Sequence, residues 1–205
     1  MPSHDIATLA DLEALYAEPG AASLAKEVDY LHPHYRAFVE ASPFCLLSTM
    51  NKQGGDCSPR GDAPGFVQVL DDRTLLLPDR RGNNRIDSLR NILADPRVGL
   101  LFLVPGVNET LRVSGTASVS TDPDLIARCM MQDKAPTTVL VIRIHSVFFQ
   151  CARALLRSRL WLADAQVPRE ALPSTGTMLA TLSQNAIDGA AYDRDLPERV
   201  RTTLY

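Results

Sequence analysis

The sequence has no long apolar run and no excess of positive charge, and both absences narrow the classes of protein it can encode. No stretch approaches the roughly 18 to 20 apolar residues that a membrane-spanning helix needs. The start, from Met1 to Ile6, lacks the basic and apolar regions of a signal peptide, so we expect a cytoplasmic protein. Lysine and arginine total 21 against 24 acidic residues, a net charge of −3, which disfavours nucleic-acid binding.

Cysteine and histidine are scarce, with four residues of each, and neither is spaced for a metal site. There is no C-x-x-C and no H-x3-5-H, so we expect reduced cysteines and no zinc. Cys45 and Cys151 lie in apolar runs, where we expect them to act as small hydrophobic residues. The G-x-G-x-x-G, G-x-x-x-x-G-K-[ST], G-x-S-x-G and H-E-x-x-H signatures are also absent, which removes the usual support for nucleotide-dependent and hydrolase functions.

What is present is the composition of an ordinary globular protein, with 45% of the 205 residues hydrophobic and 22% charged. A chain of this length buries on the order of 70% of the surface of its unfolded form, so one domain with appended helices needs no disulfide or metal. Residues 6–41 carry apolar side chains at helical spacing and predict a helical extension. Residues 44–150 show short apolar runs separated by Gly, Asp, Asn and Pro, which is typical of antiparallel strands.

These runs predict six strands, at residues 44–50, 66–70, 74–77, 98–104, 110–119 and 138–149. Two helices are predicted between them, at residues 85–93 and 122–132, the second with Asp122 as N-cap and Pro123 in its first turn.

Because closure removes exposed strand edges, we expect these strands to form a small antiparallel barrel over residues 42–162. Residues 1–41 then form a helical N-terminal extension. A helical stretch that follows Gln150 and runs through Trp161 leads into a tail over residues 163–205 with two or three short helices.

Two polar loops beside the predicted strands carry the residues best suited to hold a ligand. The first loop spans residues 58–65 and the second spans residues 78–85. In the second loop Gly82 permits a tight turn, and Asn83, Asn84 and Arg85 lead into a predicted helix. A helix N-terminus presents free N–H groups and a partial positive charge, so this loop is a candidate phosphate site. The alternative is that Asn84 caps the helix and the arginines are solvated.

The first loop places Arg60 between a proline and Gly61, where it can pair with a phosphate or a developing anion. The alternative is a local turn in which Arg60 bonds Asp62. A third cluster has Thr110 and Arg112 on one face of a predicted strand. Either that face looks into the barrel mouth, or the two residues form an exposed edge.

Taken together, several segments resemble one known family. These segments are Cys45–Thr49, Ser58–Asp62, Thr74–Asp79, Gly82–Arg85, Asp95–Phe102 and Leu111–Ala117. Their order and spacing are similar to those of the pyridoxamine 5'-phosphate oxidase-like FMN-binding split-barrel superfamily, and more narrowly to a branch of FMN-dependent proteins of unassigned substrate. The resemblance covers residues 40–162.

The resemblance implies a six-stranded antiparallel split β-barrel that forms a homodimer, with FMN in the grooves between the subunits. By this resemblance the phosphate is held at Arg60 and the start of the following helix, while residues 77–79 run along the isoalloxazine edge. Thr110 and Arg112 approach the flavin from a neighbouring strand or subunit, and residues 148–161 complete the site. The candidate cofactor-binding residues are Ser58, Arg60, Gly61, Asp62, Leu77, Pro78, Asp79, Asn83, Asn84, Arg85, Thr110, Arg112, Gln150, Arg157 and Trp161.

Two departures from the family pattern stand out. The helix start reads Asn-Asn-Arg where the oxidases have Ser/Thr-Arg-Lys, so the second basic phosphate ligand is absent or supplied by Arg80 or Arg81. The C-terminal oxidase signature is missing, since the chain reads Ala-Leu-Leu-Arg-Ser-Arg-Leu from residue 154. This argues against pyridoxamine phosphate as the substrate.

The resemblance favours an FMN-dependent oxidoreductase that acts on an unidentified small molecule by hydride transfer. Arg112 or Arg60 would then stabilise the charge of the reduced flavin, and Trp161 would cover the ring, the dimer groove or simply the core. One alternative is a flavin-binding protein with a sensing, storage or stress role and no dedicated substrate. Another is a split barrel that binds deazaflavin or haem, for which His145 on the sixth predicted strand is the candidate ligand.

Overall fold

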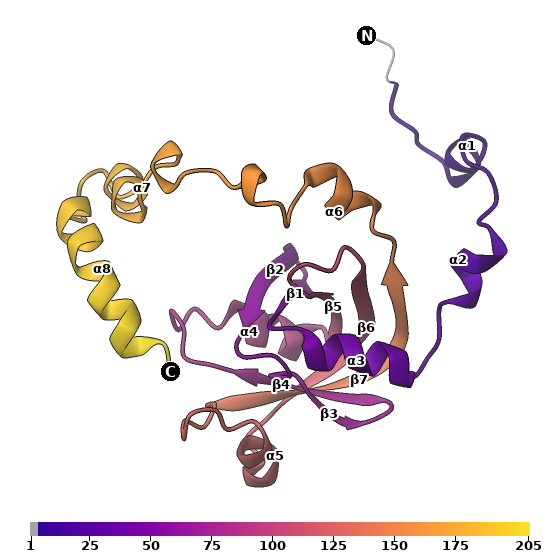
Figure 1. Ribbon diagram of the computed structural model, residues 1–205, viewed down its shortest axis with the longest axis horizontal. Helices are drawn as coiled ribbons and strands as arrows, with labels where there is room; N and C mark the ends of the chain where they lie inside the picture. The colour runs from indigo at the N-terminus through magenta and orange to yellow at the C-terminus, as the bar shows by residue number, and fades with distance from the viewer. Residues whose placement is uncertain (1–3) are drawn as a thin grey trace.

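The computed structural model describes residues 4–205, and seven strands in them form one antiparallel sheet. Figure 1 shows the sheet curled around its interior. The order across the sheet is β2-β1-β5-β6-β7-β4-β3, so β2 and β3 are its two edges and the sheet stays open. The strands are β1 (Phe44–Asn51), β2 (Gly54–Gly61), β3 (Gln68–Asp71), β4 (Thr74–Asp79), β5 (Arg97–Leu103), β6 (Thr110–Ser120) and β7 (Thr138–Gln150).

The mainly β fold with added helices is confirmed, but the predicted count of six strands is wrong, and so is full closure. The additional strand is β2, whose second half we expected to be part of the loop around Arg60. It pairs with β1 from Asn51↔Gly54 to Phe44↔Gly61. Pro59 fits there because β2 is an edge strand, the place in a sheet where proline is tolerated.

The core fills the inside of the curled sheet with alternating side chains, as strand geometry requires. Cys45 and Leu47 of β1 are fully buried in it. The middle of β4 is buried on both faces, because Leu75 and Leu77 face this core while Leu76 faces the other way. Leu76 packs in a second small cluster next to α5 (Pro123–Arg128).

A bend in the sheet depends on Gly115. The pairing of β6 with β7 shifts register between Ser114 and Gly115, which marks a bulge. A Cβ at residue 115 would lie 2.0 Å from the carbonyl oxygen of Arg143, so a larger residue cannot fit without moving the backbone.

Three helices pack on the sheet. α3 (Pro33–Ala41) buries Val39 and starts with proline in its first turn, a position that proline favours. α5 has the predicted N-cap, since Asp122 accepts a hydrogen bond from the N–H of Asp124 at 2.9 Å. α4 (Asp87–Ala94) starts two residues later than predicted, because Ile86 has a left-handed backbone with φ of 52°.

Two helical arms extend from the sheet on opposite sides in Figure 1. The N-terminal arm holds α1 (Leu9–Glu13) and α2 (Ala21–Ala25). The C-terminal arm follows β7 and holds α6 (Arg153–Ser158), two short 3-10 turns, α7 (Thr175–Leu182) and α8 (Gly189–Thr203). Both arms expose apolar side chains, among them Leu9 at 69% and Leu182 at 83%.

All four cysteines are free thiols. Cys45 and Cys129 are buried, whereas Cys57 and Cys151 are exposed, so the expectation of a buried Cys151 is wrong. The apolar run that contains it ends with β7, and Cys151 lies just beyond the sheet. Among residues 4–205 no helix is long and apolar enough to cross a membrane.

Candidate functional site

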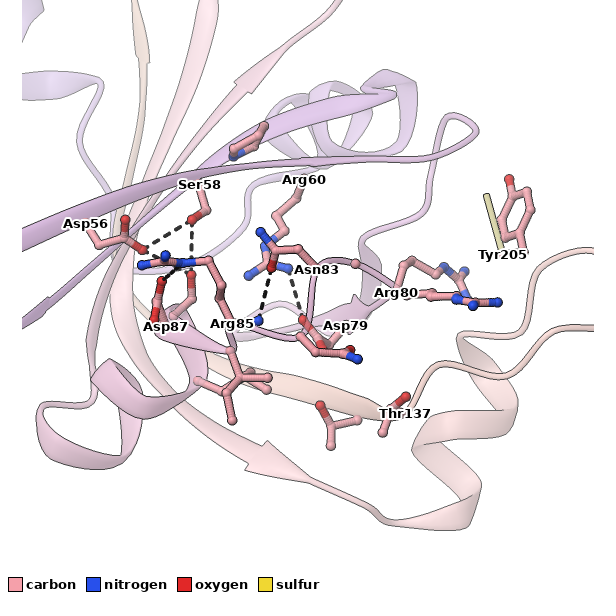
Figure 2. A pocket seen from close by; sticks show the side chains of 18 of the residues that line it. Asp56, Ser58, Arg60, Asp79, Arg80, Asn83, Arg85, Asp87, Thr137 and Tyr205 are labelled. Carbon is pink, nitrogen blue, oxygen red and sulfur yellow. Dashed lines mark hydrogen bonds and ion pairs between the residues drawn. The ribbon is translucent and has the colours of Figure 1, made fainter. Parts of the chain in front are cut away.

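A cleft of about 840 Å³ opens between β2, β4, the loop of residues 80–86, the start of α4 and the residues before β7. Figure 2 shows the polar side chains that line it. Asp56, Arg85 and Asp87 lie at one end of this cleft, and Arg80 and Tyr205 lie at the other.

An ion pair spans the middle of the cleft. Arg60 Nη1 lies 3.0 Å from Asp79 Oδ1, and the two side chains are 21% and 18% exposed. β2 and β4 are not neighbours in the sheet, so this pair bridges two strands brought together by its curvature. Because both charges are largely removed from water, each needs the other to offset its lost hydration.

Two buried polar atoms in the cleft lining have no hydrogen-bond partner. Among residues 4–205, no other buried side-chain nitrogen or oxygen lacks one. The two atoms are Arg60 Nε, on the same guanidinium that binds Asp79, and the hydroxyl oxygen of Thr138 at the start of β7. A buried donor or acceptor without a partner costs on the order of 1 to 3 kcal/mol, so these two atoms would gain from a hydrogen bond to a ligand in the cleft.

The carboxylates at the α4 end are already engaged. Asp56 Oδ2 accepts hydrogen bonds from Ser58 at 3.2 Å and from Ser88 at 3.3 Å. Arg85 Nε bonds Asp87 Oδ2 at 2.7 Å, and this hydrogen bond raises the pKa of Arg85 above its ordinary value. These contacts leave the guanidinium a permanent cation beside the helix start.

The start of α4 has free backbone donors. No side chain caps it, so the first-turn N–H groups carry no side-chain partner. Asn83 instead accepts a hydrogen bond from the N–H of Arg85 at 3.1 Å, which orders the loop before the helix. Asn84 lines the cleft with positive φ and does not cap α4, so the capping alternative is wrong.

The opposite end of the cleft is built on a second ion pair. Asp62 Oδ2 lies 2.9 Å from Arg80 Nε, and the Asp62 side chain is 1% exposed. Asp62 therefore bonds Arg80, and Arg60 bonds Asp79, so the local turn between residues 60 and 62 does not form. Tyr205 donates its hydroxyl hydrogen to Asp62 Oδ1 at 2.7 Å, and this bond raises the pKa of Tyr205.

Comparison with known proteins identifies the family. The sequence model of the pyridoxamine 5'-phosphate oxidase family matches residues 31–151, more than half of the chain. The chain belongs to the pyridoxamine 5'-phosphate oxidase family. Members of this family generally bind a flavin, and the matched segment includes the cleft walls formed by β2, β4 and α4.

Solved structures match part of the chain at low sequence identity. HupZ of Group A Streptococcus is 17% identical with a TM-score of 0.47, and the match covers 58% of this chain and 92% of HupZ. A protein of Lactobacillus delbrueckii, provisionally assigned as a pyridoxamine 5'-phosphate oxidase, is 22% identical with a TM-score of 0.46 and coverage of 59% and 95%. A Clostridium acetobutylicum protein related to general stress protein 26 is 13% identical with a TM-score of 0.43, and coverage is 57% and 85%. No curated protein sequence matches the chain significantly.

Six residues expected at the flavin of this oxidase-family protein line the cleft together. They are Ser58, Arg60, Asp79, Asn83, Asn84 and Arg85. Asp62 forms an ion pair with Arg80, which lines the cleft. Gly61 lies at the end of β2, where an added Cβ would point toward Pro43 and Phe44. Leu77 and Pro78 are buried within β4, and neither lines the cleft.

The other five expected residues lie elsewhere on the molecule. Thr110 is buried and pairs with Gln150 across β6 and β7. The Arg112 guanidinium lies 5.3 Å from the ring centre of Phe148. Trp161 donates its indole N–H to the carbonyl of Val107 at 2.8 Å, and Arg157 is exposed on α6. None of these five lines the cleft of this chain.

Sequence reasoning missed several cleft residues, chiefly Asp56, Ser88, Thr138 and Tyr205. Asp56 alternates with Ser58 and Arg60, a period of two that would have placed all three on one face had β2 been recognised as a strand. No sequence pattern marks Tyr205 as a cleft residue, because only the tertiary structure brings it to the cleft. His145 lies exposed on β7, where Thr116 is its neighbour at 3.4 Å, and it does not line the cleft.

Proposed function

We propose that the cleft binds FMN and that the protein is an FMN-dependent oxidoreductase acting on a small molecule by hydride transfer. The observation that carries the proposal is the pair of unpartnered buried atoms, Arg60 Nε and Thr138 Oγ1, inside a cleft of a flavin-binding family. Arg60 supplies an N–H donor and Thr138 a hydroxyl that can donate or accept. FMN has phosphate, ribityl and ring heteroatoms that suit both.

The charges of the cleft support an anionic ligand. Asp79 is paired with Arg60 and Asp87 with Arg85, and Asp56 is satisfied by two serine hydroxyls. Arg80 is paired with Asp62, so Arg81 and Lys134 remain against the single carboxylate of Asp56, and the side chains of the lining keep a small positive excess. The uncapped start of α4 adds the N–H groups and partial positive charge that bind phosphate at helix N-termini.

The bound flavin would supply the hydride chemistry, and the residues of this chain would bind and orient it. The first turn of α4 and Arg85 would hold the phosphate. Arg60 would stabilise negative charge that develops on the ligand, and this interaction would be strong because the side chain is largely removed from water. Arg112, our other candidate for that role, lies beside Phe148 and outside this cleft.

We further propose a homodimer with FMN between the subunits. Thr110, Arg112 and Trp161 lie away from the cleft of their own chain, so a second copy is the way to bring them to a flavin. The cleft is open to solvent on one side, and the arms expose apolar side chains that a second copy can cover.

Thr138→Val tests the FMN site most cleanly. The valine methyl replaces a buried hydroxyl that has no partner, so the free energy of unfolding of the ligand-free protein should rise by about 1 kcal/mol or more. FMN affinity should fall roughly tenfold, because a ligand hydrogen bond is lost. Fluorescence titration with FMN and urea unfolding measure the two effects.

The matched control is Thr116→Val, whose hydroxyl lies near His145 and outside the cleft. It should bind FMN like the unaltered protein. A protein that does not bind FMN at all would refute the proposed function. Equal FMN affinity in both variants would place the ligand away from Thr138.

A further inference from the structure

We propose that Tyr205 latches the segment of residues 163–205 over one end of the cleft and thereby controls how fast a ligand enters and leaves. The proposal rests on the proposed function in taking FMN as the ligand of the cleft. The latch itself is a property of the polypeptide and can be tested without FMN.

The latch acceptor is the Asp62 carboxylate, which is held in place by further hydrogen bonds. Asp62 Oδ1 accepts the Tyr205 hydroxyl at 2.7 Å and the N–H of Ala63 at 2.8 Å, while Oδ2 bonds Arg80 at 2.9 Å. The Asp62 side chain is 1% exposed and that of Arg80 is 15% exposed. The tyrosine therefore bonds a rigid, buried carboxylate, and hydrogen bonds to charged groups are the stronger kind.

Residues 163–205 are held together mainly by contacts with one another. Asp193 of α8 accepts hydrogen bonds from the Ser174 hydroxyl and from the N–H of Gly176, at 2.7 Å for the latter, so α7 and α8 form one unit. Figure 1 shows this unit standing away from the sheet and the chain returning toward it after α8. Val200 and Leu204 are 49% and 63% exposed, so apolar burial is not what secures the return.

The position of Tyr205 makes the latch a gate. Tyr205 lines the cleft together with Arg80 and Thr137, at the end opposite Asp87. A ligand whose phosphate lies at α4 would extend toward this end, where the phenol ring offers a face for a planar group. With Tyr205 bound to Asp62 that end is covered, and breaking one hydrogen bond frees the whole segment to move.

Tyr205→Phe tests the latch, with Tyr192→Phe as the matched control. Tyr192 is on α8, where Arg199 covers its ring at 4.0 Å, and it does not line the cleft. A hydrogen bond to a charged group favours the closed form on the order of tenfold or more. Tyr205→Phe should therefore speed amide hydrogen exchange in residues 198–205 several-fold, and Tyr192→Phe should not.

The functional readout is the rate of FMN binding and release by stopped-flow fluorescence. Tyr205→Phe should raise the association and dissociation rate constants together, each roughly tenfold, and change the Kd by less than about threefold. Phenylglyoxal labelling of Arg80, read by peptide mass spectrometry, should also be several-fold faster in Tyr205→Phe, and this measurement needs no flavin.

The outcomes separate the two proposals. Faster labelling of Arg80 in a protein that ignores FMN would support the latch and refute the proposed function. Unchanged hydrogen exchange and labelling would refute the latch, whatever FMN does. Faster exchange with unchanged FMN rate constants would show that Tyr205 only tethers the segment, and would overturn its role as a gate.

Discussion

At the scale of single residues, the buried amide of Asn91 joins α4 to the sheet. Its Nδ2 donates to Thr49 Oγ1 at 3.0 Å, and its Oδ1 accepts from Asn51. Asn91→Ala leaves Thr49 and Asn51 without this partner, so the free energy of unfolding should fall by about 1 to 3 kcal/mol. Urea unfolding measures it, and Leu93→Ala, at a side chain 79% exposed on the same helix, should change it by less than about 0.5 kcal/mol. Equal effects of the two variants would contradict the assigned role.

The four thiols should differ sharply in reactivity. Burial raises the pKa of the Cys45 thiol to about 12 and raises that of Cys129 as well, so neither forms the nucleophilic thiolate near neutral pH. Cys57 and Cys151 are exposed. Alkylation of the folded protein at pH 8 should label Cys57 and Cys151, and Cys45 and Cys129 only after unfolding. Peptide mass spectrometry reads this directly, and early labelling of Cys45 would contradict the buried β1 core.

At this scale the sequence predicted part of the site. Arg60, Asn83 and Arg85 were recognisable because Gly, Pro and Asn around them mark loops and helix starts. Their partners were not, since Arg60 bonds Asp79 and Asp62 bonds Arg80 through contacts between distant segments. Thr138 and Tyr205 lie in ordinary sequence contexts, and only the folded chain brings them to the cleft.

At the scale of elements, β2 shows why strand prediction failed. Its sequence, Gly-Gly-Asp-Cys-Ser-Pro-Arg-Gly, contains few residues with β propensity and several that favour turns. It is a strand because β1 supplies a complete row of hydrogen-bond partners. The other strands carry apolar alternation of their own, and their predicted positions agree with the structure within a few residues.

The pairing of α7 with α8 depends on two glycines. A Cβ at residue 176 would lie 2.0 Å from the carbonyl oxygen of Gly189 and 2.6 Å from the Asp193 carboxyl group. Gly176→Ala should therefore separate the two helices and speed hydrogen exchange across residues 175–203, while exchange in the strands stays unchanged. Gly20→Ala is the control, because no atom lies within 4 Å of its added Cβ. Unchanged exchange in Gly176→Ala would show that the helices do not pack this closely.

At the scale of the whole molecule, exposed apolar side chains are concentrated on the arms. Leu9, Leu15 and Tyr16 of the N-terminal arm are 69%, 68% and 73% exposed. Leu162 and Leu182 of the C-terminal arm are 50% and 83% exposed. So much unpaired apolar surface favours association, and two-fold dimers are the commonest form of it. Light scattering after size-exclusion chromatography should give about twice the 22.4 kDa chain mass. A mass of one chain at all protein concentrations would contradict the dimer.

The central claim is that FMN binds in the cleft between β2, β4 and α4. The most direct test is a crystal structure of the protein with FMN. It should show the phosphate at the first turn of α4 beside Arg85, with Arg60 Nε and Thr138 Oγ1 each within hydrogen-bonding distance of the ligand. FMN bound elsewhere, or bound in the cleft with both atoms still unpaired, would contradict the account.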